Sequence, residues 1–295
     1  MILVAGGTGT LGRRVVTRLL DRGDEPIRVL TRAPVRAGHL PETVQVVVGD
    51  LRTDPLEPLV EGCRTVVSAV HGFAGPTRTS PAAVDRDGNA RLVAAAQRTG
   101  VGDFVLVSVV GAAPDHPLSL HRMKYAAEQH VRASGLHATT VRATSFLETW
   151  MEIIGGNLSH GGPALVLGPG RNPINFVSAD DVAAFICLVV DGDRRIGEQL
   201  SVGGPGDLSF VEIAEHLLAH APGSAGTRHV PLPVLRALSV LARPVRPAFA
   251  RQAGAAVVMN TSDMTFDAAP LRARFPDIEA TSLARLVERL DAAAR

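Results

Sequence analysis

The sequence predicts an α/β fold built on a doubly wound parallel β-sheet, with helices covering both of its faces. Three observations predict it. Up to about residue 190, short apolar runs alternate with amphipathic helical stretches, no hairpin turn separates neighbouring runs, and a glycine-rich turn follows the first run. Such alternation implies βαβ crossovers, and strands that are buried on both faces read as continuous apolar runs.

The first strand is expected at residues 2–5, where Ile-Leu-Val-Ala leads into glycines. A helix follows over 10–22, because Leu11, Val15 and Leu19 share one face and Gly23 ends the pattern. The later strands are expected, in order, at 27–30, 44–48, 65–70, 104–107 and 138–141, and the long helices between them at 82–99 and 118–134.

After about residue 145 the alternation weakens, because glycine pairs and a Gly-Pro-Gly turn interrupt the chain. A strand is still expected at 175–177 and, behind the cap Ser178, a helix over 179–190; further helices are expected at 209–220, 231–242 and 281–294. We therefore divide the chain into a domain over 1–145 and a small, mainly helical C-terminal subdomain over 146–295, from which 172–200 return to the first sheet.

Composition excludes several classes of protein. Of the 295 residues, 46% are apolar and 20% are charged, as in globular domains, so wholesale disorder is excluded. A formal charge of +1 argues against a nucleic-acid partner. The longest clean apolar run, 182–190, is about half of a membrane span, so no transmembrane segment is expected. The histidines lack metal-ligand spacing, so no metal is expected.

The cysteines and the start of the chain predict a cytoplasmic location. Two cysteines, Cys63 and Cys187, are too few for a disulfide framework. The first strand begins at residue 2, which leaves no room for a targeting segment.

The strongest functional signal is the glycine loop over residues 6–12, between the first strand and the first helix. It reads as Gly7-x-Gly9-x-x-Gly12 or as Gly6-x-x-Gly9-x-x-Gly12. The shared glycines would allow close approach of a pyrophosphate and tight helix–strand packing, and the helix N-terminus would attract the phosphates. The alternative is a plain tight turn. The expected cofactor contacts here are Gly6, Thr8, Gly9, Thr10, Leu11 and Gly12.

Basic residues predict NADP(H) rather than NAD(H). Proteins of this type that prefer NAD carry an acidic residue about 20 positions after the glycines, but here that position is Arg32. A guanidinium suits a 2′-phosphate, and Arg13 would add a second cation. The alternative is that both arginines are solvated surface charges.

With these features, the chain resembles the NmrA-like family of atypical short-chain dehydrogenase/reductases, whose core is a Rossmann-type domain. The matching stretches lie at 4–12, 29–32, 48–51, 108–112, 124–128, 134–136, 140–142 and 175–182. The resemblance implies that Asp50 and Leu51 lie by the adenine, that Ala69 and Val70 line the nicotinamide side, that Lys124 bonds the nicotinamide ribose, and that Phe146 and Trp150 form a wall of the substrate pocket.

Four further residues complete the predicted site. Ser108, at the end of the fifth strand, is counted among the cofactor contacts, although its hydroxyl can also bond the backbone. His71 and Phe73 follow the fourth strand, where a loop should pass the nicotinamide, and are placed in the substrate pocket. His121 lies three residues before Lys124, on the same helix face, and is counted with it as catalytic. Its alternative is an ordinary exposed histidine.

The usual proton relay of short-chain reductases is missing. Their Tyr-x-x-x-Lys motif would place a tyrosine at Leu120, and their serine would fall at Val110. The single tyrosine, Tyr125, directly follows Lys124 and so points elsewhere on the helix; it reads as a packing residue. No built-in acid is needed if hydride goes to a quinone or a flavin, because solvent can protonate the product.

The C-terminal half has an uneven distribution of charge. Between His216 and Ser262 there are five arginines (228, 236, 243, 246 and 251) and no Asp or Glu. This segment reads as a lid over a greasy or anionic substrate, as a contact with a membrane surface or a partner, or as an amphipathic helix packed on the subdomain core.

The sequence therefore predicts an NADPH-dependent oxidoreductase that acts on a small-molecule substrate, a fairly apolar acceptor such as a quinone, an enone or an imine. The alternative is a non-catalytic NADP(H)-binding redox sensor or scaffold, which the missing relay favours. Whether the protein forms a homodimer is left open by the sequence.

Overall fold

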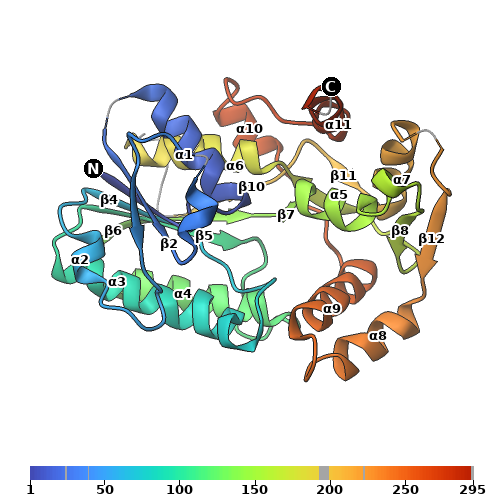
Figure 1. Ribbon diagram of the computed structural model, residues 1–295, viewed down its shortest axis with the longest axis horizontal. Helices are drawn as coiled ribbons and strands as arrows, with labels where there is room; N and C mark the ends of the chain where they lie inside the picture. The colour runs from blue at the N-terminus through green and yellow to red at the C-terminus, as the bar shows by residue number, and fades with distance from the viewer. Residues whose placement is uncertain (24, 39, 193–198, 222, 294–295) are drawn as a thin grey trace. The chain divides into compact units, whose positions relative to one another are not determined.

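The computed structural model describes residues 1–23, 25–38, 40–192, 199–221 and 223–293, which form two compact units (Figure 1). Unit 1 comprises Met1–Ala143 and Val182–Ser201, and unit 2 comprises Thr144–Asp181 and Val202–Arg295. The chain thus leaves unit 1 two residues before the expected boundary at 145 and returns to it at Val182 rather than at 172.

Unit 1 is organised around a seven-stranded sheet with the order β10-β6-β5-β4-β1-β2-β3. The six strands from β3 to β6 pair in parallel, which confirms the predicted doubly wound parallel sheet. Their bounds are β1 Ile2–Ala5, β2 Ile27–Thr31, β3 Gln45–Val48, β4 Thr65–Ser68, β5 Asp103–Val109, β6 His137–Ala143 and β10 Gln199–Val202.

The central strands of this sheet are completely buried. Every residue of β1 and β4 is buried, although only β1 is an unbroken apolar run, because β4 begins with Thr65 and ends with Ser68. In β3, which forms one edge, three of the four residues are exposed, although three of the four are valines. The apolar runs therefore predicted the strands but not which of them lie at the centre of the sheet.

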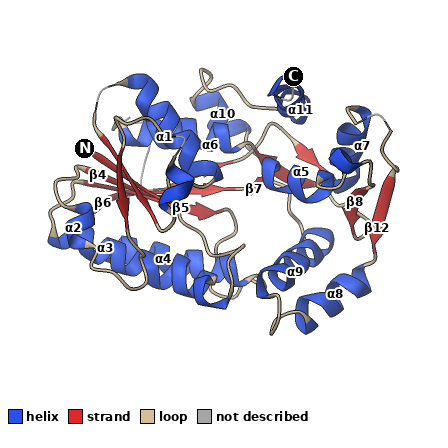
Figure 2. Cartoon of the chain, viewed as in Figure 1, coloured by secondary structure: helices blue, strands red, loops and turns tan. Residues whose placement is uncertain are grey.

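Helices cover both faces of the sheet, with α1 and α6 on one face and α3 and α4 on the other (Figures 1 and 2). The bounds are α1 Thr10–Arg22, α2 Glu57–Val60, α3 Asn89–Arg98, α4 Ser119–Ala133 and α6 Ala179–Val190, with short 3-10 turns η1 Pro34–Ala37 and η2 Thr77–Thr79. Gly23 ends α1 in the left-handed conformation, as its position predicts (φ 71°).

The expected helix over 82–99 is present, but its first part is a π-helix, η3 (Ala82–Gly88), that runs directly into α3. The Asn89 side chain explains the wider turn, because its amide donates to the Asp85 carbonyl oxygen (2.7 Å). A side chain that takes a helix carbonyl in this way interrupts the regular backbone ladder. The Asn89 amide oxygen in turn accepts a hydrogen bond from the Ser68 hydroxyl at the end of β4 (2.5 Å).

Unit 2 combines helices with two small sheets, ordered β11-β9-β7 and β12-β8. The strands are β7 Ser145–Phe146, β8 Ala164–Leu167, β9 Ile174–Val177, β11 Asp207–Leu208 and β12 Thr227–Val230. The helices are α5 Leu147–Gly155, η4 Leu158–His160, α7 Phe210–Ala219, α8 Leu232–Leu241, α9 Pro247–Thr261, α10 Ala269–Arg274 and α11 Leu283–Ala293. A capping box of Ser209 and Glu212 fixes the start of α7.

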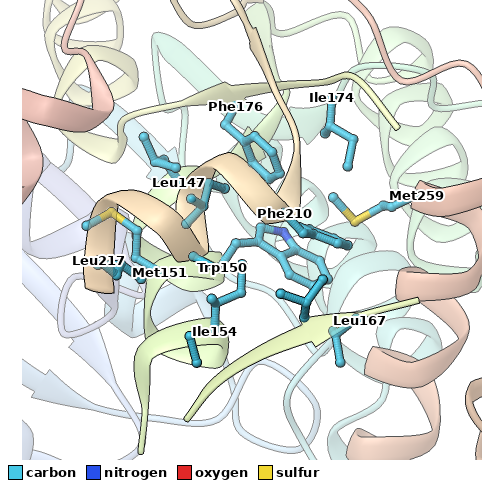
Figure 3. Packing of buried hydrophobic residues seen from close by; sticks show 14 of the residues in the cluster. Leu147, Trp150, Met151, Ile154, Leu167, Ile174, Phe176, Phe210, Leu217 and Met259 are labelled. Atoms are coloured by element: carbon cyan, nitrogen blue, oxygen red, sulfur yellow. The ribbon is translucent and has the colours of Figure 1, made fainter. Parts of the chain in front are cut away.

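The core of unit 2 is built around aromatic rings (Figure 3). Trp150 of α5 is 6% exposed, and its ring centroid lies 4.8 Å from that of Phe210. Phe176 of β9 and Met259 of α9 belong to the same buried cluster. Trp150 thus fills the interior of this unit, and its predicted place in a substrate-pocket wall stays a prediction.

Candidate functional site

The glycine loop forms a tight turn between β1 and α1 in which two glycines have no room for a side chain. Gly6 has a φ of +82°, and a Cβ there would lie 2.9 Å from the Ala69 carbonyl oxygen. A Cβ at Gly12 would lie 2.2 Å from the Gly6 carbonyl oxygen. The Gly9 N–H donates to that same Gly6 oxygen (2.9 Å), which closes the turn. The glycine pattern is therefore required for the loop itself.

The start of α1 contributes the positive end of a helix to this loop. Gly9 is its N-cap, and its first turn holds Arg13 and no acidic residue. Leu11 and Gly12 are buried under the turn, whereas Thr10 and Arg13 are exposed. Leu11 and Gly12 thus support the turn, and the contacts of Thr10 and Arg13 with a ligand stay predictions.

A cavity of about 360 Å³ opens beside the loop, at the carboxyl ends of β1, β2 and β4. Parallel α/β sheets bind ligands at this edge. The predicted site residues that line it are Gly6, Thr8, Gly9, Arg32, Asp50, Leu51, Ala69, Val70 and His71. The sequence analysis did not identify four other lining residues with polar or bulky side chains, namely Leu30, Thr31, Arg52 and Val84.

The end of the cavity next to β2 carries two guanidinium groups. Arg32 is exposed there, and the Arg52 Nε donates to both carboxylate oxygens of Asp50 (2.9 and 3.1 Å). The hydrogen bonds from Arg52 lower the pKa of Asp50, and the charge of Arg32 adds to the shift. Because two cations face one carboxylate, this end of the cavity is net positive. Arg52 could have been considered from the sequence, because it lies only two residues after the predicted adenine contact Asp50.

Lys124 is buried near the end of β4 and is bound by other protein groups. Its side chain is 4% exposed, and its ammonium group donates to the Val70 and Val107 carbonyl oxygens (2.9 and 2.8 Å). The third partner is an Asp85 carboxylate oxygen at 2.9 Å. This third contact is an ion pair without a hydrogen bond, because that oxygen of Asp85 has no hydrogen-bond partner within the described part of the chain. Lys124 thereby connects β4, β5 and the π-helix, and its contact with a ribose stays a prediction.

Asp85 is a buried, charged residue of this region that sequence reasoning missed. It is completely buried in η3, and its second carboxylate oxygen accepts the Gly72 N–H (2.8 Å). Asp85, Asn89 and Leu92 recur at a helical spacing and are all buried. A carboxylate in such a buried stripe is a signal in itself, because an ion is almost never buried without a partner.

Ser108 belongs to a second buried polar group. Its hydroxyl donates to a Glu128 carboxylate oxygen (2.5 Å), and the Arg142 Nε donates to the same oxygen (2.9 Å). This ion pair raises the pKa of Arg142. Ser108 is 1% exposed, so its hydroxyl serves this carboxylate rather than the backbone.

His121 stacks on a second histidine in the loop that follows β5. The ring centroids of His116 and His121 are 3.9 Å apart, with an interplanar angle of 8°. Within the described part of the chain, the buried Nδ1 of His121 has no hydrogen-bond partner. Burial lowers the pKa of His121 to about 3, and the neighbouring His116 adds to the shift. At neutral pH His121 is therefore uncharged and has no imidazolium proton to give.

This stack predicts that the protein loses stability as the pH falls. An unfolded histidine titrates near pH 6.5. Because the folded pKa of His121 is lower, the unfolded state binds protons first, so the stabilisation is complete above about pH 6.5 and is lost on acidification towards pH 3. We expect a loss of about 1–2 kcal/mol in the free energy of unfolding between pH 7 and pH 5. Urea unfolding at both pH values measures it.

The variant His121→Phe should keep a ring on His116 and flatten this pH dependence. The matched control is His130→Phe, an exposed position of the same helix, which should retain the wild-type slope. An unchanged slope in His121→Phe would show that the acid sensitivity arises elsewhere.

The predicted substrate-pocket residues are distributed between the two units. His71 lines the cavity with an exposed ring, although the crowded protein surroundings lower its pKa; the carboxylate of Asp85 opposes this effect and Lys124 adds to it. Phe73 is half-buried in the following loop of unit 1. Phe146 belongs to β7 and Trp150 to α5, both in unit 2.

Two other kinds of site can be assessed from the described residues. No three His, Cys, Asp or Glu side chains among them gather closely enough to hold a metal ion. Within the same residues, every helix is too short or too polar to cross a bilayer.

Comparison with known proteins places the chain in a family. The sequence model of the NAD(P)H-binding family matches residues 6–192. The chain is 33% identical over 223 residues to an NAD(P)H azoreductase of Xenophilus azovorans, covering 75% of this chain and 74% of the relative. It is 32% identical over 209 residues to a (4-alkanoyl-5-oxo-2,5-dihydrofuran-3-yl)methyl phosphate reductase of Streptomyces griseus, covering 70% and 68%.

A longer alignment pairs the chain with a different kind of protein. The photosystem II assembly factor Ycf39 of Synechocystis is 28% identical over 284 residues, which is 93% of this chain and 85% of the relative. Among solved structures, Citrobacter triphenylmethane reductase with NADP(H) superposes with a TM-score of 0.78 and 19% identity, covering 98% and 99% of the two chains.

The NADPH complex of a quinone oxidoreductase from Escherichia coli gives a TM-score of 0.77 at 20% identity, with the same coverage. These structural likenesses confirm the fold, and the sequence matches confirm the relationship that the motifs predict. The chain therefore belongs to the NAD(P)H-binding family.

Proposed function

We propose that the protein is an NADPH-dependent oxidoreductase that transfers hydride to a small, fairly apolar acceptor of the quinone, enone or imine type. The observation that carries the proposal is the cavity at the carboxyl ends of β1, β2 and β4, with a glycine loop along one side and guanidinium groups at one end. The azoreductase and dihydrofuranone reductase relatives support a conjugated acceptor.

The residues of the cavity fit a dinucleotide. Bare backbone at Gly6 and Gly9 lets a pyrophosphate approach the N-terminus of α1, whose partial positive charge favours it. Arg32 and Arg52 lie at the β2 end, where a 2′-phosphate gains charge-assisted hydrogen bonds. Asp50, held by Arg52, is left as an acceptor for hydroxyl groups. When bound, the reduced nicotinamide supplies the hydride.

The role of the protein residues in this reaction is to hold the acceptor, while the proton comes from solvent. Ala69 and Val70 offer an apolar wall at the end of β4, and the neutral ring of His71 beside them can donate one hydrogen bond to an acceptor oxygen or nitrogen. The positions of the usual tyrosine and serine are occupied by half-buried Leu120 and Val110. Solvent then protonates the reduced product, which suits acceptors that spread the incoming charge by conjugation.

Multiple turnover tests this proposal. We expect NADPH oxidation, followed at 340 nm, to exceed the protein concentration many-fold when a benzoquinone, an azo dye or a conjugated enone is supplied. The control is the same protein with NADPH and no acceptor. If each of the three acceptor classes consumes no more than one equivalent of NADPH, the protein is a binding protein rather than a reductase.

That second candidate, a non-catalytic NADP(H)-binding scaffold, is favoured by one observation. The alignment with the assembly factor covers 93% of this chain, whereas the alignment with the azoreductase covers 75% of it. The scaffold predicts NADPH binding of the same affinity without turnover, so the turnover measurement separates the two candidates.

The preference for NADPH is predicted to depend on Arg32. The variant Arg32→Asp removes a charge-assisted contact and places a carboxylate near Asp50, so the Kd for NADPH should rise about 10- to 100-fold. The Kd for NADH should change little, because NADH lacks the 2′-phosphate. Calorimetric titration of both cofactors measures the split, and Arg132→Asp, an exposed position on α4, is the charge-matched control. Equal losses for NADPH and NADH would place the 2′-phosphate elsewhere.

A further inference from the structure

Helix α8 of unit 2 presents apolar side chains to solvent. Val234, Val240 and Leu241 are 45%, 56% and 75% exposed, whereas Leu235 on the other side of the helix is 3% exposed and packs in the core. At 100° per residue, the three exposed residues and exposed Ala237 fall on one arc. A helix at a water-exposed surface ordinarily shows polar residues on this face.

The apolar surface continues through the turn into α9. Val245 in the turn is 82% exposed, and Phe249 in the first turns of α9 is 44% exposed. In the part of the chain that the structure describes, five of the eight large hydrophobic residues that are exposed lie between positions 234 and 249. Single exposed hydrophobic residues need no explanation, but a cluster marks a contact surface. We call residues 232–261 the α8–α9 hairpin.

The charges interspersed among these apolar residues are all positive. Arg236, Arg243 and Arg246 are exposed, and the sequence has no Asp or Glu from His216 to Ser262. In unit 1, by contrast, some exposed arginines pair with carboxylates, as Arg64 does with Glu25. The hairpin therefore combines an apolar exposed face with arginine charges, and no carboxylate between residues 216 and 262 neutralises them.

We propose that the α8–α9 hairpin docks on an anionic lipid bilayer, lying in the plane of the interface. Val240, Leu241 and Val245 would enter the boundary between headgroups and acyl chains, while the long arginine side chains reach the lipid phosphates. An apolar face flanked by arginines is the chemistry of interfacial helices, and such a helix rests on a bilayer without crossing it. The hairpin belongs to unit 2, whereas the residues that line the cavity beside the glycine loop belong to unit 1.

The same charges disfavour the other occupants. A symmetric contact between two copies would bring the arginines of both hairpins together with no carboxylate from either segment, and juxtaposed like charges are costly. Protein interfaces concentrate tyrosine and tryptophan at their centres. The exposed residues of the hairpin are instead valines and a leucine with one phenylalanine.

Vesicle sedimentation of the full chain tests the proposal. Vesicles of phosphatidylcholine alone are compared with vesicles that contain one quarter phosphatidylglycerol, in 50 mM and in 500 mM salt. We expect at least tenfold stronger association with the anionic vesicles at low salt and loss of that difference at high salt, where the surface potential is screened.

Two double variants separate the apolar and the cationic contributions. Leu241→Asp with Val245→Asp should lower the association at least tenfold, and Arg243→Gln with Arg246→Gln should reduce it to the level of neutral vesicles. Their matched controls are Val35→Asp, at an exposed valine of unit 1, and Arg132→Gln with Arg18→Gln, at exposed arginines of unit 1; both should bind as wild type. Unchanged thermal unfolding and NADPH affinity show that each variant is folded.

Three results would overturn the proposal. The first is equal or absent binding to both kinds of vesicle by the wild-type chain. The second is a concentration-dependent dimer in light scattering that the Leu241→Asp, Val245→Asp variant abolishes, which would make the hairpin an interface between copies. The third is a rise in that variant's KM for the acceptor that the protein reduces, with no change in vesicle binding. That result would assign the apolar face to substrate binding.

Discussion

Alanine in place of Gly12 is expected to abolish cofactor binding and to destabilise unit 1. The added Cβ would lie 2.2 Å from the Gly6 carbonyl oxygen and 2.7 Å from the Gly7 Cα. Both atoms are backbone of the same tight turn, so no flexible side chain can move aside. Overpacking of this kind costs about 1–3 kcal/mol or more, and here relief requires the phosphate-binding turn to open. We expect a Kd for NADPH at least 100-fold higher.

Calorimetric titration and urea unfolding measure the two effects, and two other glycines serve as references. A Cβ at Gly9 would lie 3.3 Å from the Gly6 oxygen, so Gly9→Ala should keep most of the stability but weaken NADPH binding, because Gly9 lines the cavity. Gly206 has no atom within 4 Å of the added Cβ, and Gly206→Ala should change neither quantity. Wild-type affinity in Gly12→Ala would show that the turn is not the cofactor site.

The variant Asp85→Asn is expected to lower the free energy of unfolding by about 3–5 kcal/mol, since breaking a buried ion pair leaves an uncompensated charge. Lys124 would remain buried with only the carbonyl oxygens of Val70 and Val107 as partners. The Gly72 N–H would keep an acceptor only if the new amide oxygen faces it. The ends of β4 and β5 and the π-helix should therefore loosen together.

A double-mutant cycle with Lys124→Met isolates the pair. The combination Asp85→Asn, Lys124→Met removes the unpaired charge and should recover much of the stability lost in either single variant. The Kd for NADPH gives an independent readout. If Lys124 also bonds the nicotinamide ribose, the Kd should stay raised in the double variant, although its stability is recovered. If Asp85→Asn lowered the free energy of unfolding by less than about 1 kcal/mol, the result would contradict a buried ion pair between Asp85 and Lys124.

The sheet and the glycine loop were predictable because their signals are local. β1 is fully buried and so reads as an unbroken apolar run, and Gly12 is required by contacts with Gly6 and Gly7 of the same turn. Their alternation with α1 and α4 fixes the crossover pattern without reference to distant residues. The prediction that this edge of the sheet binds the cofactor rests on the same local pattern.

The missed features depend on contacts between distant residues. β8 and β12 pair across some sixty positions, with Ala164 opposite Thr227, and neither run is long enough to identify a strand alone. α9 was missed because its buried residues are four alanines and one methionine, so the sequence shows no clear stripe of large apolar residues. The sequence placed only the first of the two hairpin helices.

The site shows the same limit at the level of single residues. The carbonyl oxygens of Val70 and Val107 that hold Lys124 have no side-chain signature, so the spacing of Lys124 could not reveal that its ammonium is engaged. Likewise, the burial that keeps His121 neutral and its stack with His116 depend on a loop conformation. Residue types indicated the chemistry of the region, and burial decided which groups remain available to a ligand.

The discontinuity of unit 1 has a consequence for synthesis on the ribosome. Strand β10 and most of α6 belong to this unit, although the chain builds Thr144–Asp181 of unit 2 before reaching them. When the first 143 residues have emerged, β6 is still an open edge, and the face that α6 will cover is bare, which is the condition in which nascent chains aggregate. A gene fragment that stops at the end of β6 would make that exposure permanent, so the smallest expressible cofactor domain must carry the intervening segment as well.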